Sequence, residues 1–109
     1  MQTIQLKKFG TVLVSRPSGL EVFRAIRPTL DASQPVAIDF TGVLTDTPSW
    51  FDEFLTSLAK MFAGRVELMP TENASVRAML PVLAANRDDT AAPIFHQALE
   101  YMNEAHNHI

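Results

Sequence analysis

The residues best placed to do chemistry lie where a polar loop leads into a helical pattern. Thr47 followed by Pro48 is typical of a helix start, because threonine caps free backbone N–H groups and proline fits the first turn. Those N–H groups, together with the helix dipole, favour an anion at this point of the chain. The candidate site residues for partner binding or regulation are Asp46, Thr47, Ser49, Trp50, Asp52 and Glu53.

Each side chain of this group has a functional and a structural interpretation. Ser49 either caps the helix with Thr47, at about 1 kcal/mol per cap, or accepts a phosphate that the dipole stabilises by roughly 0.5–2 kcal/mol. Asp52 and Glu53 could act in acid–base catalysis, but the helix dipole alone explains acids in a first turn. Trp50 is either an edge residue of the core or an exposed binding anchor.

Signatures of enzymes and metal proteins are missing from the chain. The four glycines are isolated, so there is no phosphate-binding loop or dinucleotide turn. Without cysteine there is no thiolate metal site. His106 and His108 do not share a helical face, and His96 is remote in sequence. We predict a protein that is not an enzyme and has no metal and no cofactor.

Size and charge narrow the class of protein further. The 109 residues, 47% hydrophobic and 19% charged, predict a single folded domain over residues 1–109. A net charge of −3 argues against nucleic-acid binding. The chain has no run of about 18 apolar residues, which argues against a membrane span. Since cysteine is absent, a reducing compartment suits the chain, and we expect the cytoplasm.

Apolar periodicity predicts strands and helices that alternate along the chain. Residues 3–7 and 11–14 have strand patterns and are expected to pair as an opening hairpin. Residues 36–40 and 65–69 are further strands. Four helical patterns are expected. The first follows Ser18, which forms a capping box with Glu21, and Pro28 should kink or end its last turn. The second follows Thr47, and the third covers residues 73–86, kinked or split at Pro81. The fourth has Thr90 or Asp89 as its cap.

This order of elements, β-β-α-β-α-β-α-α, places the chain in the α/β class. Strands separated by helices build a sheet whose crossovers lie on its faces. We therefore expect a small mixed sheet of about four strands with the helices mainly on one face.

The amino-acid sequences of two segments resemble those of a known family. Residues 37–43 and 47–55 resemble the STAS-like domain family of uncharacterised bacterial and mobile-element proteins, which is similar to the anti-sigma factor antagonists. The resemblance covers residues 2 to about 102 and implies a STAS-like fold. The chain departs from the parent STAS fold at residues 86–93, which contain no apolar run where that fold has a late strand.

The resemblance also implies a partner. In anti-sigma factor antagonists, phosphorylation of a serine at the start of a helix controls binding to a kinase-like ATPase. By position Ser49 resembles that serine, whereas Thr47, Pro48 and Trp50 replace the aspartate, first serine and glycine of the family's Asp-Ser-Ser-Gly pattern. The expected function is that of a regulatory protein-interaction module that binds its partner through residues 45–55.

Two interpretations from other classes stay open. The helix start after Thr47 could hold the anionic group of a small molecule or nucleotide, which would make the chain a sensing domain. Alternatively, the final helix or a free sheet edge could form the interface of a homodimeric structural subunit.

Overall fold

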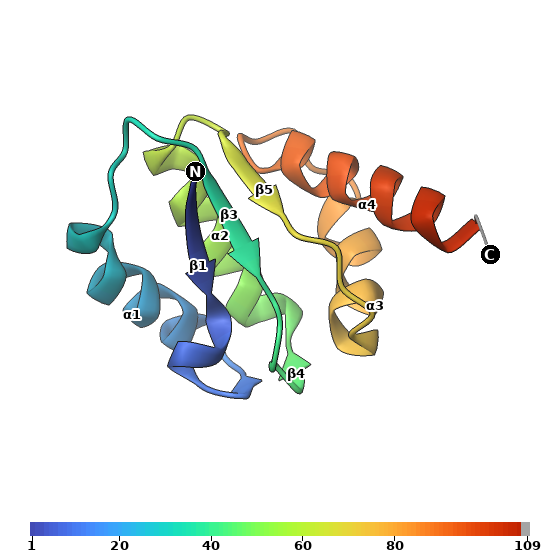
Figure 1. Ribbon diagram of the computed structural model, residues 1–109, viewed down its shortest axis with the longest axis horizontal. Helices are drawn as coiled ribbons and strands as arrows, with labels where there is room; N and C mark the ends of the chain where they lie inside the picture. Colours follow the sequence, from blue (N-terminus) through green and yellow to red (C-terminus); the bar gives the residue numbers. More distant parts are fainter. Residues whose placement is uncertain (108–109) are drawn as a thin grey trace.

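Three parallel strands form the main sheet. The computed structural model describes residues 1–107, with the side chains of residues 1–103. Within it, β1 (Gln2–Gln5), β3 (Val36–Asp39) and β5 (Val66–Leu68) are hydrogen-bonded in the order β1-β3-β5 (Figure 1). The α/β class is therefore confirmed. Both pairings are parallel, so the prediction of a mixed sheet is wrong.

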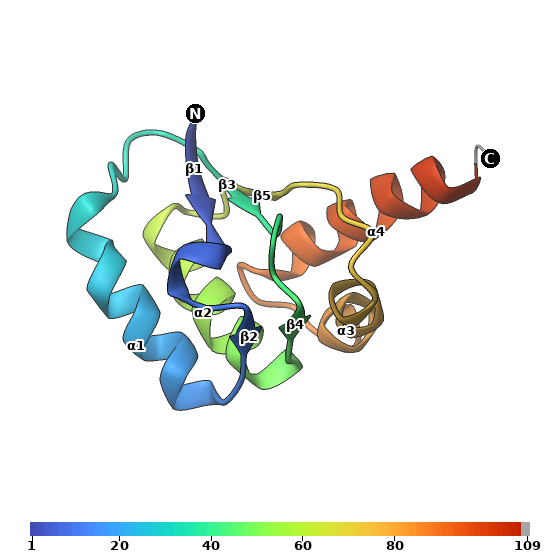
Figure 2. The ribbon, with the colours of Figure 1, turned by 60° about the horizontal axis from the view of Figure 1, so that its bottom comes forward.

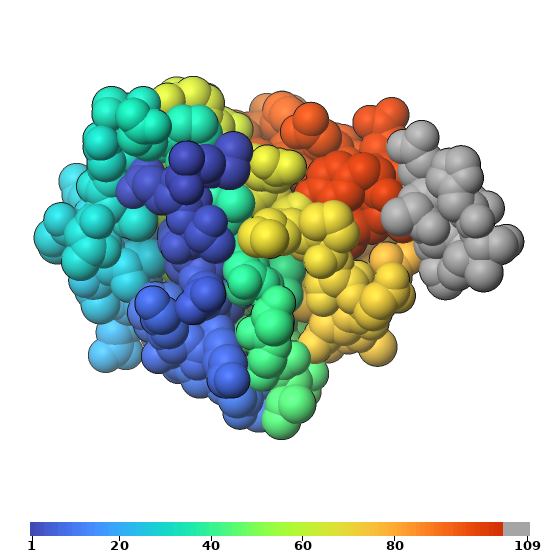
Figure 3. Space-filling view, in the orientation of Figure 1, coloured from blue at the N-terminus to red at the C-terminus, as the bar shows by residue number. Residues whose placement is uncertain are grey.

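The main sheet has one buried and one open face. Ile4, Ile38 and Leu68 lie in register across the three strands, and all are buried. Thr3 and Glu67 point to the other face and are exposed, as alternation along a strand requires. Figure 2 shows the helices gathered on the buried side of the sheet. Ala37 lies between Thr3 and Glu67 in the register and is buried. Nevertheless, no helix of residues 1–107 covers the strands on this side (Figure 3), an arrangement that parallel sheets rarely adopt.

The predicted opening hairpin is wrong. A 3₁₀ helix, η1 (Leu6–Phe9), separates β1 from β2 (Val12–Leu13), and β2 pairs in parallel with β4 (Thr45–Asp46) in a second, two-stranded sheet. The physical reason is that β1 buries Ile4 by pairing with β3, which a hairpin would not provide. The sequence pattern missed β4, because two residues show no periodicity.

Four α-helices follow the expected order, with corrections at their ends. Ser15, not Ser18, caps the first helix: its Oγ accepts the N–H of Ser18 at 3.3 Å. That helix ends just before Pro28, as predicted. The third helix runs through Pro81 without a break, so a split into two pieces is wrong. The helices are α1 (Arg16–Ile26), extended by the 3₁₀ helix η2 (Arg27–Thr29), α2 (Pro48–Met61), α3 (Ala74–Ala84) and α4 (Ala92–Asn107).

The core is centred on α2. The apolar face predicted from helical spacing is entirely buried, which confirms that part of the sequence reading. Side chains from the sheet and from the other helices join α2 in one cluster. The buried face of α2 and its C-terminal end comprises Phe51, Phe54, Leu55, Leu58, Ala59 and Phe62.

Gly19 allows α1 and α2 to approach closely. A Cβ atom at this position would lie 2.3 Å from the backbone oxygen of Trp50. We therefore expect Gly19→Ala to lower the free energy of unfolding by about 1–3 kcal/mol, although alanine is the better helix former by about 1 kcal/mol. Urea unfolding checks this, with Ala25→Gly at an exposed site of the same helix as the control. A Gly19→Ala variant as stable as the native chain would contradict the close packing.

Candidate functional site

The two-stranded sheet places the starts of α1 and α2 side by side at one end of the molecule (Figure 2). We call this end the tip. Leu13 of β2 lies opposite Asp46 of β4. The backbone N–H and the hydroxyl of Thr47 both donate to the Leu13 carbonyl, each at 3.1 Å. Thr47 thus occupies the N-cap position, as predicted, but its hydroxyl ties α2 to β2 instead of capping the helix.

Trp50 belongs to the core, which confirms the first of its two interpretations and rules out a role as an exposed partner-binding anchor. Its side chain is 0% exposed and stacks on Phe54 with ring centroids 5.0 Å apart. The reason is tertiary: α1 packs at Gly19 directly over the turn of α2 that carries Trp50. Among the described side chains, none accepts a hydrogen bond from its buried indole N–H.

Asp46 is buried as well, so it is not the surface contact that the sequence predicted. It is 2% exposed, and in the described part of the chain neither carboxylate oxygen has a hydrogen-bond partner. Its backbone N–H donates to the hydroxyl of Ser75 at 3.0 Å, which fixes β4 to the start of α3. Burial raises the pKa of Asp46 to about 7. The nearby Thr47 N–H offsets this only in part, because it donates to the Leu13 carbonyl and does not complete a hydrogen bond to the carboxylate.

Asp52 and Glu53 form ion pairs. They lie beyond the first turn of α2, so the helix-dipole interpretation is wrong. Arg16 donates to Asp52 at 2.9 Å and to Glu53 at 3.1 Å, and Arg87 bonds the other oxygen of Asp52. Burial favours a higher pKa for Asp52, but the hydrogen bonds from Arg87 and Arg16 outweigh it and hold the pKa below its usual value. These carboxylates join α1, α2 and the segment after α3.

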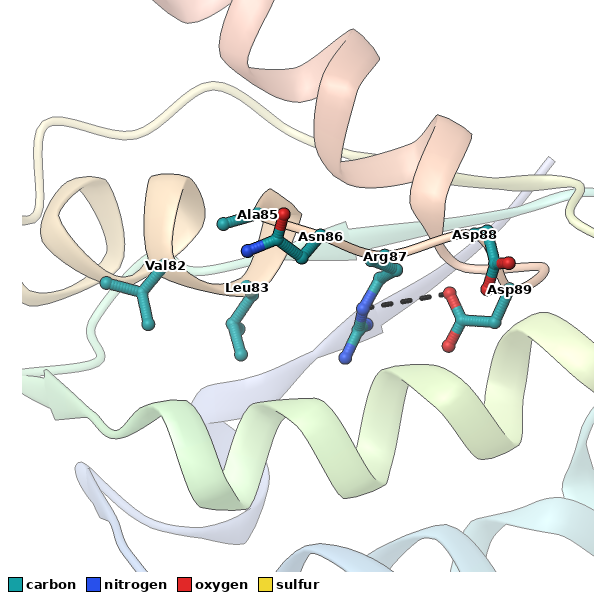
Figure 4. Close-up of a pocket in the computed structure, with 7 residues that line it drawn as sticks. All are labelled: Val82, Leu83, Ala85, Asn86, Arg87, Asp88 and Asp89. Atoms are coloured by element: carbon teal, nitrogen blue, oxygen red, sulfur yellow. Dashed lines mark ion pairs between the residues drawn. The ribbon is translucent and has the colours of Figure 1, made fainter.

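The end of α3 and the segment after it form a groove of about 330 Å³, lined by residues 82, 83 and 85–89 (Figure 4). Figure 4 shows the Arg87 side chain extending from that segment toward α2. The guanidinium lies 4.8 Å from the ring centroid of Phe95, and its Nε lies 3.7 Å from Asp89. Asp52, Asp89 and Phe95 hold Arg87 in place, although its buried Nη1 has no hydrogen-bond partner among the described residues. We therefore assign the groove a structural role.

Ser49 is half-buried in the first turn of α2. It lies between the N-cap residue Thr47 and the buried Trp50, so it belongs to the tip and is only partly covered. Its phosphorylation stays a prediction.

Exposed aliphatic side chains gather at the tip, a feature that sequence reasoning missed. Val12, Val14 and Leu44 are 56%, 48% and 69% exposed. Thr45 lies opposite Val12 in the ladder, and the N–H of Leu44 donates to the carbonyl of residue 11 at 2.8 Å. We call Val12, Val14, Leu44 and Thr45 the apical patch. Strand alternation could have revealed it, because two valines that flank a buried residue must both face outward.

The histidines predicted not to bind metal fall into two groups. His96 is exposed on α4, whereas the side chains of His106 and His108 lie outside the described residues. Within the described part of the chain, no three His, Asp or Glu side chains converge as a metal site requires.

Comparison with known proteins identifies no family or function for this chain. No protein-family model, curated protein or solved structure matches this chain. Within residues 1–107, no helix has both the length and the apolar character needed to cross a bilayer.

Proposed function

We propose that this chain is a non-enzymatic regulatory module that binds a protein partner. The binding surface consists of the apical patch together with residues 45–55, which include the start of α2. The observation that carries the proposal is three exposed aliphatic side chains at the two-stranded sheet: Val12 lies in β2, Val14 directly follows β2, and Leu44 directly precedes β4. Where exposed apolar side chains form a contiguous patch rimmed by polar residues, the patch marks an interaction site. The surface is also held in place, because Thr47 ties α2 to β2.

The free edge of β2 supports the same proposal. β2 pairs with β4 on one side, and in the described part of the chain no strand pairs with its other side. A two-stranded sheet is marginal by itself, and an exposed edge accepts an extended segment of a partner through backbone hydrogen bonds. The partner would then cover Val12 and Val14 as it adds a strand.

Two energetically costly features at the tip also support a functional role there. Ser15 has φ +76° and ψ 143°, a conformation that a residue with a side chain rarely adopts. Asp46 is a buried carboxylate without a hydrogen-bond partner among the described residues. Such features collect at functional sites, because they persist only where the surrounding structure holds them.

The kind of partner follows from the STAS-like resemblance of residues 37–43 and 47–55. By that resemblance we propose a kinase-like ATPase in the cytoplasm as the partner, with phosphorylation of Ser49 as the control. A phosphate on Ser49 would add negative charge about one helical turn before the two acidic residues Asp52 and Glu53. It would therefore act by repelling an acidic partner surface, and Ser49→Asp would reproduce the effect.

The test is a double variant, Val12→Ser with Leu44→Ser. Both side chains are exposed, so we expect stability to change by no more than about 0.5 kcal/mol. Affinity capture from the native cell followed by calorimetry with the captured protein should show binding weakened by more than about tenfold. The matched control is Val82→Ser, which removes an equally exposed valine (65%) from α3, away from the tip.

Other outcomes of the same study identify the two alternative functions. If light scattering shows a dimer that the double variant dissociates, the apical patch is the interface of a homodimeric subunit. If inorganic phosphate shifts the amide resonances of Thr47, Ser49 and Trp50, the helix start is an anion-sensing site. If the double variant binds its partner as tightly as the native chain, the apical patch is not the docking surface.

A further inference from the structure

A second groove lies far from the tip along the same two helices. α1 and α2 run side by side from the close approach at Gly19. Toward their C-terminal ends a groove of about 530 Å³ opens between them. Phe23 of α1 and Met61 of α2 give it an apolar floor, since both are largely buried in or packed against the core. Its other lining residues are Arg27, Ser57 and Lys60.

The charges of this groove have one sign. Arg27 and Lys60 are exposed, one contributed from each side of the groove, and no acidic residue lines it. Among the ion pairs of residues 1–103, neither cation takes part. The hydroxyl of Ser57 is already used, because it donates to the Glu53 carbonyl at 2.8 Å.

The position of the two cations has a partial structural explanation. Both lie in the last turn of a helix, where a positive charge stabilises the helix dipole. That effect does not require the two cations to line one groove beside an apolar floor. The combination of two cations, unpaired among the described residues, and an apolar floor is complementary to an acidic segment that carries a large apolar side chain.

We propose that this groove, independently of the apical patch, docks a short acidic motif of a partner protein. A bulky apolar side chain of the motif rests on Phe23 and Met61, and carboxylates on either side of it pair with Arg27 and Lys60. The motif is short, because Phe23 and Arg27 are one helical turn apart, roughly 6 Å.

The probe is a labelled synthetic peptide with a Leu-Phe pair between glutamates, and its matched control carries lysines in place of the glutamates. Fluorescence anisotropy with the full chain should show binding of the acidic peptide alone, weakening as salt is added. The double variant Arg27→Glu with Lys60→Glu should weaken binding by at least about tenfold. Arg24→Glu is the matched control, since Arg24 is an exposed cation of α1 outside the groove, and it should change binding by less than about twofold.

Amide resonances locate the peptide, and the shifts should centre on the five lining residues. The proposal is overturned by equal binding of the lysine peptide, by an equal loss with Arg24→Glu, by shifts centred elsewhere, or by no binding. Binding to phosphatidylserine vesicles without binding to the peptide would overturn it as well, in favour of a membrane surface. If circular dichroism shows that the double variant is unfolded, Arg27→Gln with Lys60→Gln replaces it. The apical variant Val12→Ser with Leu44→Ser should bind the peptide normally, which separates this inference from the proposed function.

Discussion

Asp46→Asn should raise the free energy of unfolding at pH 8 by about 2–4 kcal/mol. The native carboxylate is charged at that pH but 2% exposed, and among the described residues it has no hydrogen-bond partner. Burial raises its pKa from 3.8 to about 7, so the folded state at pH 8 bears the full cost of the charge. Asparagine has nearly the same shape and no charge, which removes that cost.

The sign of the pH dependence follows from the same shift. A carboxyl group with a raised pKa in the folded state binds its proton more tightly there than in the unfolded chain. The native protein should therefore lose stability as the pH rises from about 4 to about 7, with little further change above. Asp52 works in the opposite direction, but only at lower pH, because its pKa is held below its usual value.

Urea unfolding at pH 5 and at pH 8 measures the effect of Asp46. The difference in stability between the two pH values should shrink in Asp46→Asn. It should persist in the control Asp88→Asn, which changes an exposed aspartate. A native chain that is more stable at pH 8 than at pH 5, or a variant with an unchanged difference, would show that Asp46 is not a buried charge.

Trp50→Ala should lower the free energy of unfolding by about 3–5 kcal/mol. The indole is 0% exposed, stacks on Phe54 and lies under the contact between Gly19 and α2. Its loss leaves a cavity that the surrounding helices can close only in part. Since single domains are stable by about 5–15 kcal/mol, this one change removes a large share of the total.

Trp50→Phe is the matched control for this prediction. It keeps an aromatic ring against Phe54 and removes the indole N–H, which has no partner among the described residues. We expect a loss of about 1–2 kcal/mol, with part of the lost packing offset by the removal of a buried polar group. Thermal unfolding of both variants checks the order. A Trp50→Ala variant as stable as the native chain would show that Trp50 is exposed in solution.

The burial of Trp50 also changes how the docking surface must be tested. A loss of partner binding in Trp50→Ala would report unfolding as readily as a lost contact. Variants at Val12 and Leu44 avoid this problem, because both side chains are exposed and their truncation leaves the core intact.

Local pattern was sufficient to predict the helices and the strands of the main sheet. The apolar face of α2, from Phe51 to Phe62, follows from helical spacing alone, and Thr47 with Pro48 marks where that helix begins. The strand at Val36–Asp39 was visible as a short apolar run. Each of these features depends on residues within a few positions of one another. The spacing of apolar side chains along the sequence is therefore enough to predict them.

Tertiary structure decided the strand partners and the character of the tip. Pairing of β1 with β3, and of β2 with β4, joins residues more than thirty positions apart, and no local pattern specifies such a choice. Asp46 was expected at a binding surface and Trp50 at either the core edge or the surface, but α3 and α1 pack against them. Val12 and Val14 looked like hairpin residues, yet they are exposed. Burial depends on which elements meet, and that is settled only when the whole chain packs.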